Sequence, residues 1–131
     1  MASLIVLSRT LLCLGCVDQA RLRRDEALAE AQRISPCNRT YALCDAWSGD
    51  WAIEGKTAVH TMLQSAEAAL AVSREQNFPM FLGLGNIMRG WCLAAMGQTL
   101  EGIPLITQGI TLRRRDAGCV LTLPFFSSDA R

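Results

Sequence analysis

The sequence predicts an all-α fold in which about three antiparallel helix pairs stack as an α-solenoid, with a step of 41 residues. The pair Glu26-Ala27 recurs as Glu67-Ala68 and, in altered form, as Gln108-Gly109, at 41 residues each time. The chain has 131 residues, which hold three such steps, and 50% of them are hydrophobic. This period is typical of helical-repeat arrays, in which a two-helix unit buries its apolar face against its neighbours.

The first predicted unit has helices over residues 3–14 and 18–34, separated by a turn at Gly15. Asp18 is the candidate N-cap of the second helix, because a short carboxylate accepts hydrogen bonds from the first free N–H groups. Pro36 ends the unit, since proline lacks the N–H that a continuing helix needs.

The second predicted unit has helices over residues 40–47 and 57–76. Between them, Ser48-Gly49-Asp50-Trp51 combines polar residues with a glycine and is predicted to be an irregular connection. Asn77-Phe78-Pro79 is expected to end the unit.

The third predicted unit has helices over residues 80–96 and 99–113, with a turn at Gly97 and Thr99 as the candidate N-cap. Pro104 removes a backbone donor from its second helix. Three glycines are each expected to weaken its first helix by about 1 kcal/mol relative to alanine. These glycines are Gly83, Gly85 and Gly90.

The repeats are thus assigned to residues 1–118. Residues 119–131 are predicted to be an irregular C-terminal tail that begins an incomplete repeat, since Leu123-Pro124-Phe125-Phe126 has the composition of a new unit. The last unit is therefore expected to lack the polar cap that repeat arrays need for solubility.

Charge and hydropathy predict neither a nucleic-acid nor a membrane partner. The formal net charge is +1, from 13 basic and 12 acidic residues, and a nucleic-acid binder is expected to carry an unbroken basic stripe. Arg21, Arg23 and Arg24 alternate with acids and are interpreted as a solvated helix face. The most apolar stretch, residues 78–95, is interrupted by Asn86 and Arg89. A cytoplasmic location is the simplest interpretation.

No metal, cofactor or catalytic site is predicted. Cys13 and Cys16 form a lone CxxC, and His60 is the one histidine, so no tetrahedral zinc set is complete. Cys44 and Cys92 lie in apolar helical runs, where free cysteine behaves as a small buried hydrophobe. His60 has no nucleophile or carboxylate at a catalytic spacing.

Gly55-Lys56-Thr57 has the ending of a phosphate-binding loop, but five residues separate Gly49 from Gly55 where a P-loop requires four. The segment is interpreted as the turn that enters the helix over 57–76. A nucleotide-linked activity through Lys56 and Thr57 is kept as the rival hypothesis.

The repeat step also predicts a binding face. It superimposes Asp45 on Asn86, two polar residues within apolar first helices, and Arg89 lies one turn beyond Asn86. Together with Tyr41 they form a candidate groove for a peptide or protein partner. The alternative is that these side chains are simply solvated.

The third unit also resembles a known family. It contains Gly83-Leu84-Gly85-Asn86, Gly90-Trp91-Cys92-Leu93-Ala94-Ala95-Met96-Gly97-Gln98 and Glu101-Gly102-Ile103, and the first unit contains Leu14-Gly15, Asp18-Gln19-Ala20 and Glu26-Ala27-Leu28. These runs resemble the tetratricopeptide-like C-terminal region of large bacterial signalling ATPases, many of which carry an adenylate/guanylate cyclase or DNA-binding domain. The resemblance extends over residues 5–126, and is specific in the third unit and loose in the second.

The resemblance implies that cyclase and ATPase chemistry resides in domains N-terminal to the repeats, so it assigns no catalytic residue to this chain. The chain departs from the family at Pro104 and after Phe126. The leading hypothesis is a non-catalytic scaffold, a fragment of such a parent protein, that binds a protein, a peptide or other domains of the parent. The alternatives are a remnant with nucleotide-binding or cyclase activity and a non-functional truncated reading frame.

Overall fold

A computed structural model describes residues 1–115, which form six α-helices and one short 3₁₀-helix and contain no β-strand. The elements are α1 (Ala2–Cys13), α2 (Val17–Ile34), α3 (Pro36–Glu54), η1 (Gly55–Ala58), α4 (Val59–Gln76), α5 (Pro79–Ala95) and α6 (Thr99–Arg115). The predicted all-α class is therefore confirmed for these residues. The predicted tail over 119–131, with its incomplete repeat, lies outside the described residues.

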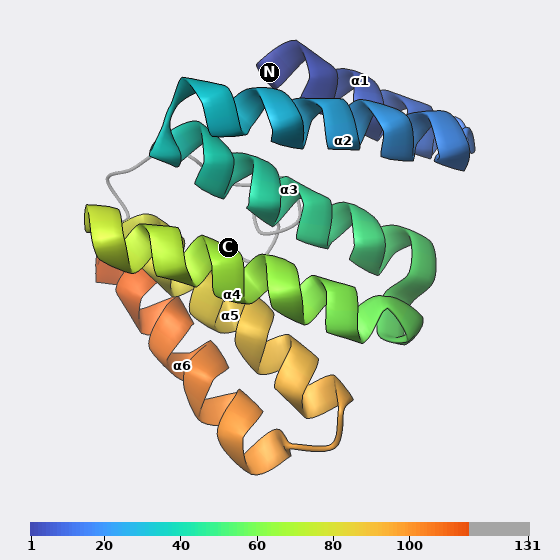
Figure 1. Cartoon of the computed structure of the whole chain (residues 1–131). Coiled ribbons are helices and arrows are strands. Elements are labelled where there is room, and N and C mark those ends of the chain that lie inside the picture. The colour runs from blue at the N-terminus through green and yellow to red at the C-terminus, as the bar shows by residue number, and fades with distance from the viewer. Residues whose placement is uncertain (116–131) are drawn as a thin grey trace.

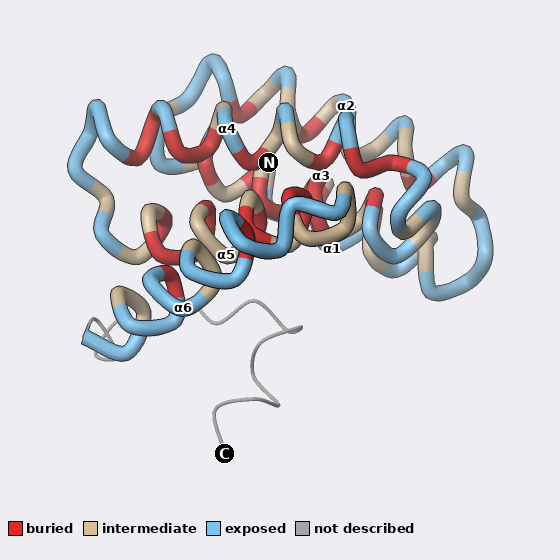
Figure 2. The backbone as a smooth tube through the Cα atoms, turned by 90° about the horizontal axis from the view of Figure 1, so that it is seen from below, coloured by how far each residue is buried: buried red, intermediate tan, exposed pale blue. Residues whose placement is uncertain are grey.

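The helices follow one another in space in chain order, and each packs against the next (Figure 1). In addition, α1 contacts α3 and α3 contacts α5. Seen from below, α2 and α4 run along one side of the molecule, and α1 and α5 lie toward the other (Figure 2). α3 thus has four helical neighbours, and its residues 44–48 are all buried.

The first and last turns between helices have the same geometry. Gly15 and Gly97 lie 82 residues apart, and both have positive φ, 83° and 91°, a conformation that glycine adopts without a Cβ penalty. After Gly15, the N–H of Cys16 donates to the carbonyl of Leu11 at 2.9 Å. After Gly97, the N–H of Gln98 donates to the carbonyl of Leu93 at 2.8 Å. These bonds satisfy carbonyl groups at the helix end in the same way at both turns.

The predicted N-caps are wrong by one or two residues. α2 begins at Val17, so Cys16 is its N-cap and Asp18 lies inside the first turn. Thr99 is the first residue of α6, and the carbonyl that accepts from the next free N–H groups belongs to Gln98. Pro36 does end the preceding helix, but it also begins α3, whose N-cap Ser35 accepts a hydrogen bond from the N–H of Asn38. Proline is well suited to this first helical position.

The irregular connection predicted over residues 48–51 is wrong, because α3 continues through it to Glu54. The polar residues that indicated a loop have partners within the fold. The hydroxyl of Ser48 donates to the carbonyl of Cys44 at 3.0 Å, and the buried Asp50 forms an ion pair with Arg24 of α2. The actual connection is η1, which begins at Gly55 with φ 58°.

Glycines on α5 and α6 let these two helices touch backbone to backbone. A Cβ on Gly90 would lie 2.6 Å from the carbonyl oxygen of Gly102, and a Cβ on Gly83 would lie 2.9 Å from that of Gly109. No side chain fits at such distances. The glycines predicted to weaken α5 are therefore the residues that permit its close packing on α6. α6 itself continues past Pro104 to Arg115.

The recurring helical pair is only partly kept in the fold. Ala27 and Gly109, 82 residues apart, are both buried, but Ala68 is half-buried and its neighbour Ala69 takes the fully buried place in α4. Ala69 is 42 residues from Ala27 and 40 from Gly109. The middle helix pair is therefore displaced by one residue from the sequence repeat.

Two hydrophobic clusters form the core. The larger joins α3, η1, α4 and α5, and the smaller joins α1, α2 and α3. Cys44 and Cys92 are fully buried in the larger cluster, as predicted. Trp47 packs edge-on against Trp91, with ring centroids 5.8 Å apart, and its Nε1 donates to the sulfur of Cys92 at 3.4 Å. Tyr41 touches both clusters, so it joins the two parts of the core.

α6 keeps an exposed apolar row, formed by Leu100, Ile103 and Ile110, of which Leu100 is 92% exposed. The buried residues of α6 are the two glycines that contact α5, Gly102 and Gly109. None of the helices in residues 1–115 combines the length and the apolar character needed to cross a membrane.

Candidate functional site

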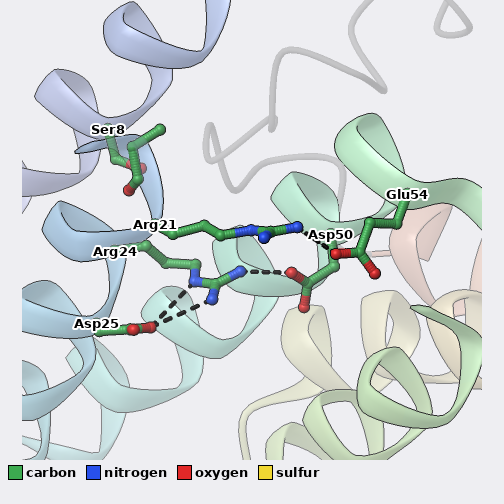
Figure 3. Close-up of polar contacts among 7 residues, drawn as sticks. Ser8, Arg21, Arg24, Asp25, Asp50 and Glu54 are labelled. Atoms are coloured by element: carbon green, nitrogen blue, oxygen red, sulfur yellow. Dashed lines mark hydrogen bonds and ion pairs between the residues drawn. The ribbon is translucent and has the colours of Figure 1, made fainter. Parts of the chain in front are cut away.

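A network of ion pairs joins α2 to α3 (Figure 3). Arg24 pairs with Asp50 of α3 and also with its neighbour Asp25 at 3.2 Å, and Arg21 pairs with Glu54. The side chains of Arg24 and Asp50 are only 18% and 10% exposed. The interpretation of Arg21 and Arg24 as a solvated face is therefore wrong, because α3 supplies carboxylates from 26 and 33 residues further along the chain.

Asp45 is buried and is held by α1. Nε of Arg9 donates to its Oδ1 at 2.6 Å, and the Asp45 side chain is 6% exposed. Burial raises the pKa of the Asp45 carboxyl, because removal from water disfavours the charged form, while the guanidinium groups of Arg9 and Arg24 oppose this rise. The carboxylate predicted to face a groove is thus covered by an arginine from the preceding helix pair.

The other candidate residues lie in different surroundings. Tyr41 is half-buried between the two core clusters. Asn86 is half-buried on α5, and Arg89 lies one turn further along the same helix. Nε of Arg89 is 3.6 Å from Oε1 of Glu67 on α4. The structure therefore keeps Asn86 and Arg89 together on α5, whereas Asp45 is tied to α1.

The 41-residue step also fails to give α3 and α5 matching contacts. Ala42 packs with the cluster of α1 and α2, whereas Gly83, one step later, packs on α6. Because these residues precede Asp45 and Asn86 by one turn on the same side of each helix, the two polar residues do not share an environment. Binding of a peptide by these side chains stays a prediction.

Arg89 lines a shallow depression of about 240 Å³ between α4 and α5. Its other lining residues are Glu67, Leu70 and Arg74, all from α4. Leu70 is buried and lies against Gly85, where a Cβ would come within 2.8 Å of the leucine side chain. Sequence reasoning missed Arg74 as a site residue, because its recurrence with Arg33 and Arg115 at 41-residue steps indicated only the end of each unit.

The phosphate-loop segment is a helical turn. Gly55–Ala58 forms η1, and the hydroxyl of Thr57 donates to the carbonyl of Glu54 at 2.8 Å. Lys56 and His60 are exposed. The interpretation of this segment as the turn that enters the next helix is confirmed, with α4 beginning at Val59.

The cysteines separate into two kinds. Cys13, Cys16 and Cys37 are exposed, whereas Cys44 and Cys92 are buried. Burial, with a smaller contribution from Asp45, raises the pKa of Cys44 to about 12, and burial also raises that of Cys92. Within residues 1–115, no three His, Cys, Asp or Glu side chains are grouped as a metal would require.

Comparison with models of known protein families, with curated proteins and with solved structures finds no match to this chain. The functional argument therefore depends on the geometry of the chain itself. The ion pairs between α2 and α3 are engaged with one another, whereas the depression between α4 and α5 leaves polar side chains open to solvent.

Proposed function

We propose that this chain is a non-catalytic helical-repeat scaffold, a tetratricopeptide-like α-solenoid of three helix pairs that binds a protein or peptide partner. The observation that carries the proposal is the repetition of one helix-turn-helix geometry 82 residues apart. The turns at Gly15 and Gly97 have the same backbone conformation and the same terminal hydrogen bond. Stacked units of one geometry present an extended surface, which is the usual use of such arrays.

Two further features support a stacked array. The hydroxyl of Ser8 meets the carbonyl of Ala20 at 2.8 Å, and the residues 82 positions later, Gly90 and Gly102, mark the close crossing of α5 and α6. Contacts of α3 with both α1 and α5 link the first helices of successive pairs. Such contacts are expected when each pair packs on the next and not in an isolated three-helix bundle.

The resemblance to the C-terminal region of signalling ATPases and nucleotide cyclases gives this scaffold a role in a parent protein, where it regulates or positions other domains in the cytoplasm. The chemistry of such a parent lies outside the repeats. Thr57 donates its hydroxyl to a backbone carbonyl and the segment Gly55–Ala58 is helical, so no feature here favours the rival nucleotide hypothesis.

Site-directed photo-crosslinking tests the binding role. A photoreactive amino acid at Asn86, on the exposed side of α5, is expected to give a discrete adduct in cells that express the native gene. The control places it at the exposed Gln19 of α2. Adducts that are the same from both positions would contradict a partner-binding face on α5.

Circular dichroism separates the scaffold from a non-functional remnant. A folded scaffold gives a strongly helical spectrum and one cooperative thermal transition. Binding of labelled ATP that is lost in Lys56→Ala would instead support the nucleotide-linked alternative.

A further inference from the structure

The depression between α4 and α5 combines two cations with an apolar floor. Arg74 lies on the last turn of α4 and Arg89 on α5, and Leu70 lies between them at the bottom. Two guanidinium groups from different helices thus border one concave surface, with Glu67 as the single carboxylate on its rim. The depression carries a net positive charge although the chain as a whole is nearly neutral.

Neither arginine has a strong partner. Arg74 is exposed, and within residues 1–115 no hydrogen bond or ion pair engages it. Arg89 is 35% exposed and reaches only the 55% exposed Glu67, at an N···O distance of 3.6 Å. A pair at this distance and exposure contributes little. Both guanidinium groups are therefore available to an incoming anion.

We propose that this depression binds a carboxylate side chain of an acidic peptide segment, held between Arg74 and Arg89. The inference rests on the proposed scaffold function and names the chemistry of its partner. A guanidinium group matches the two oxygens of a carboxylate with parallel N–H donors. The apolar floor at Leu70 accommodates the methylene groups of a glutamate, and a shallow, open surface admits a side chain that projects from a longer chain.

Glu67 acts in this site as an internal competitor. Its carboxylate contacts Arg89 in the free chain, so a peptide carboxylate must displace it. Removal of the Glu67 charge is therefore expected to increase affinity, whereas removal of either arginine is expected to decrease it.

The test is a fluorescence-anisotropy titration of the full chain with a capped, labelled hexaglutamate peptide at low ionic strength. Arg74→Ala and Arg89→Ala are each expected to weaken binding by about fivefold, the upper range for an exposed charge pair. Glu67→Gln is expected to strengthen it by a similar factor.

Arg33→Ala is the matched control, because Arg33 occupies the position 41 residues before Arg74 and is likewise exposed on the last turn of its helix. It is expected to leave the affinity unchanged. Glu101→Gln, which removes an exposed charge from α6, controls in the same way for Glu67→Gln. Thermal unfolding of each variant shows that the chain remains folded.

Two outcomes would overturn the inference. Equal losses in Arg33→Ala and Arg74→Ala would show a general charge effect and no site between α4 and α5. Inorganic phosphate that displaces the peptide at equal concentration of anionic groups would show a phosphate site instead of a carboxylate site. Either result leaves the scaffold proposal standing, because crosslinking at Asn86 tests that separately.

Discussion

The first helix pair, α1–α2, and the last, α5–α6, have the same turn but are held together by different interactions. In the first pair a buried hydroxyl, that of Ser8, donates to the carbonyl of Ala20. In the last pair the same two positions are Gly90 and Gly102, and the helices touch through their backbones. The comparison teaches that a repeat can keep its geometry while a polar interaction is replaced by close steric fit.

The largest expected effect tests the steric contact. Gly90→Ala is expected to lower the free energy of unfolding by about 2 kcal/mol, because its Cβ would lie 2.6 Å from a backbone oxygen. Gly49→Ala is the matched control: Gly49 is also helical and lies 41 residues earlier, but nothing lies within 4 Å of its Cβ position. This control is expected to be neutral or to stabilise by up to about 1 kcal/mol.

Urea unfolding followed by circular dichroism measures both glycine variants. Equal effects of the same sign would show that α5 and α6 do not depend on backbone contact.

A smaller effect is expected for the polar interaction in the first pair. Ser8→Ala removes the donor to the buried carbonyl of Ala20 and is expected to destabilise the chain by about 1 kcal/mol. Thr10→Ala removes an exposed hydroxyl that donates within α1 to Val6, and it is expected to have almost no effect. If the two variants unfold at the same urea concentration, the Ser8 bond does not hold the pair together.

The smallest effect concerns pH, because Arg9 offsets part of the cost of burying Asp45. The raised pKa of Asp45 means that the folded chain binds this proton more tightly than the unfolded chain. The free energy of unfolding is therefore expected to fall as the pH rises above the ordinary aspartate range, and to level off above the folded-state pKa.

Asp45→Asn should remove this part of the pH dependence. Unfolding measured between pH 4 and pH 8, a range that begins near the ordinary aspartate pKa, tests this in both chains. Parallel pH profiles for the two would contradict an unfavourable burial of the Asp45 charge.

Local sequence signals located most of the helices. Proline at 36 and positive-φ glycines at 15 and 97 mark chain reversals by their own backbone chemistry, so they were predictable without knowledge of neighbours. Ser48 and Asp50 were misread because their partners, a backbone carbonyl of the same helix and an arginine of another helix, are features of the folded chain. Composition alone therefore indicated a loop where tertiary pairing supports a helix.

The candidate site was less predictable than the helices. Arg89 was named from the sequence, and it does line the depression with Arg74. Arg74 and Glu67 come from α4 and meet Arg89 only through the packing of two helices, so no spacing in the sequence links all three. Asp45 was named as well, but its partner Arg9 lies 36 residues earlier. A repeat step relates positions only when the units are in register, and the middle pair is displaced by one residue.

The burial of Cys44 and Cys92 makes each thiol a clock for its helix. A thiol reacts as the thiolate, and the raised pKa of both groups slows that reaction in addition to their enclosure. Cys13, Cys16 and Cys37 should be alkylated at once in the native chain. The delayed modification of Cys44 and Cys92 then counts how often α3 and α5 open, which resolves the breathing of single helices within the array.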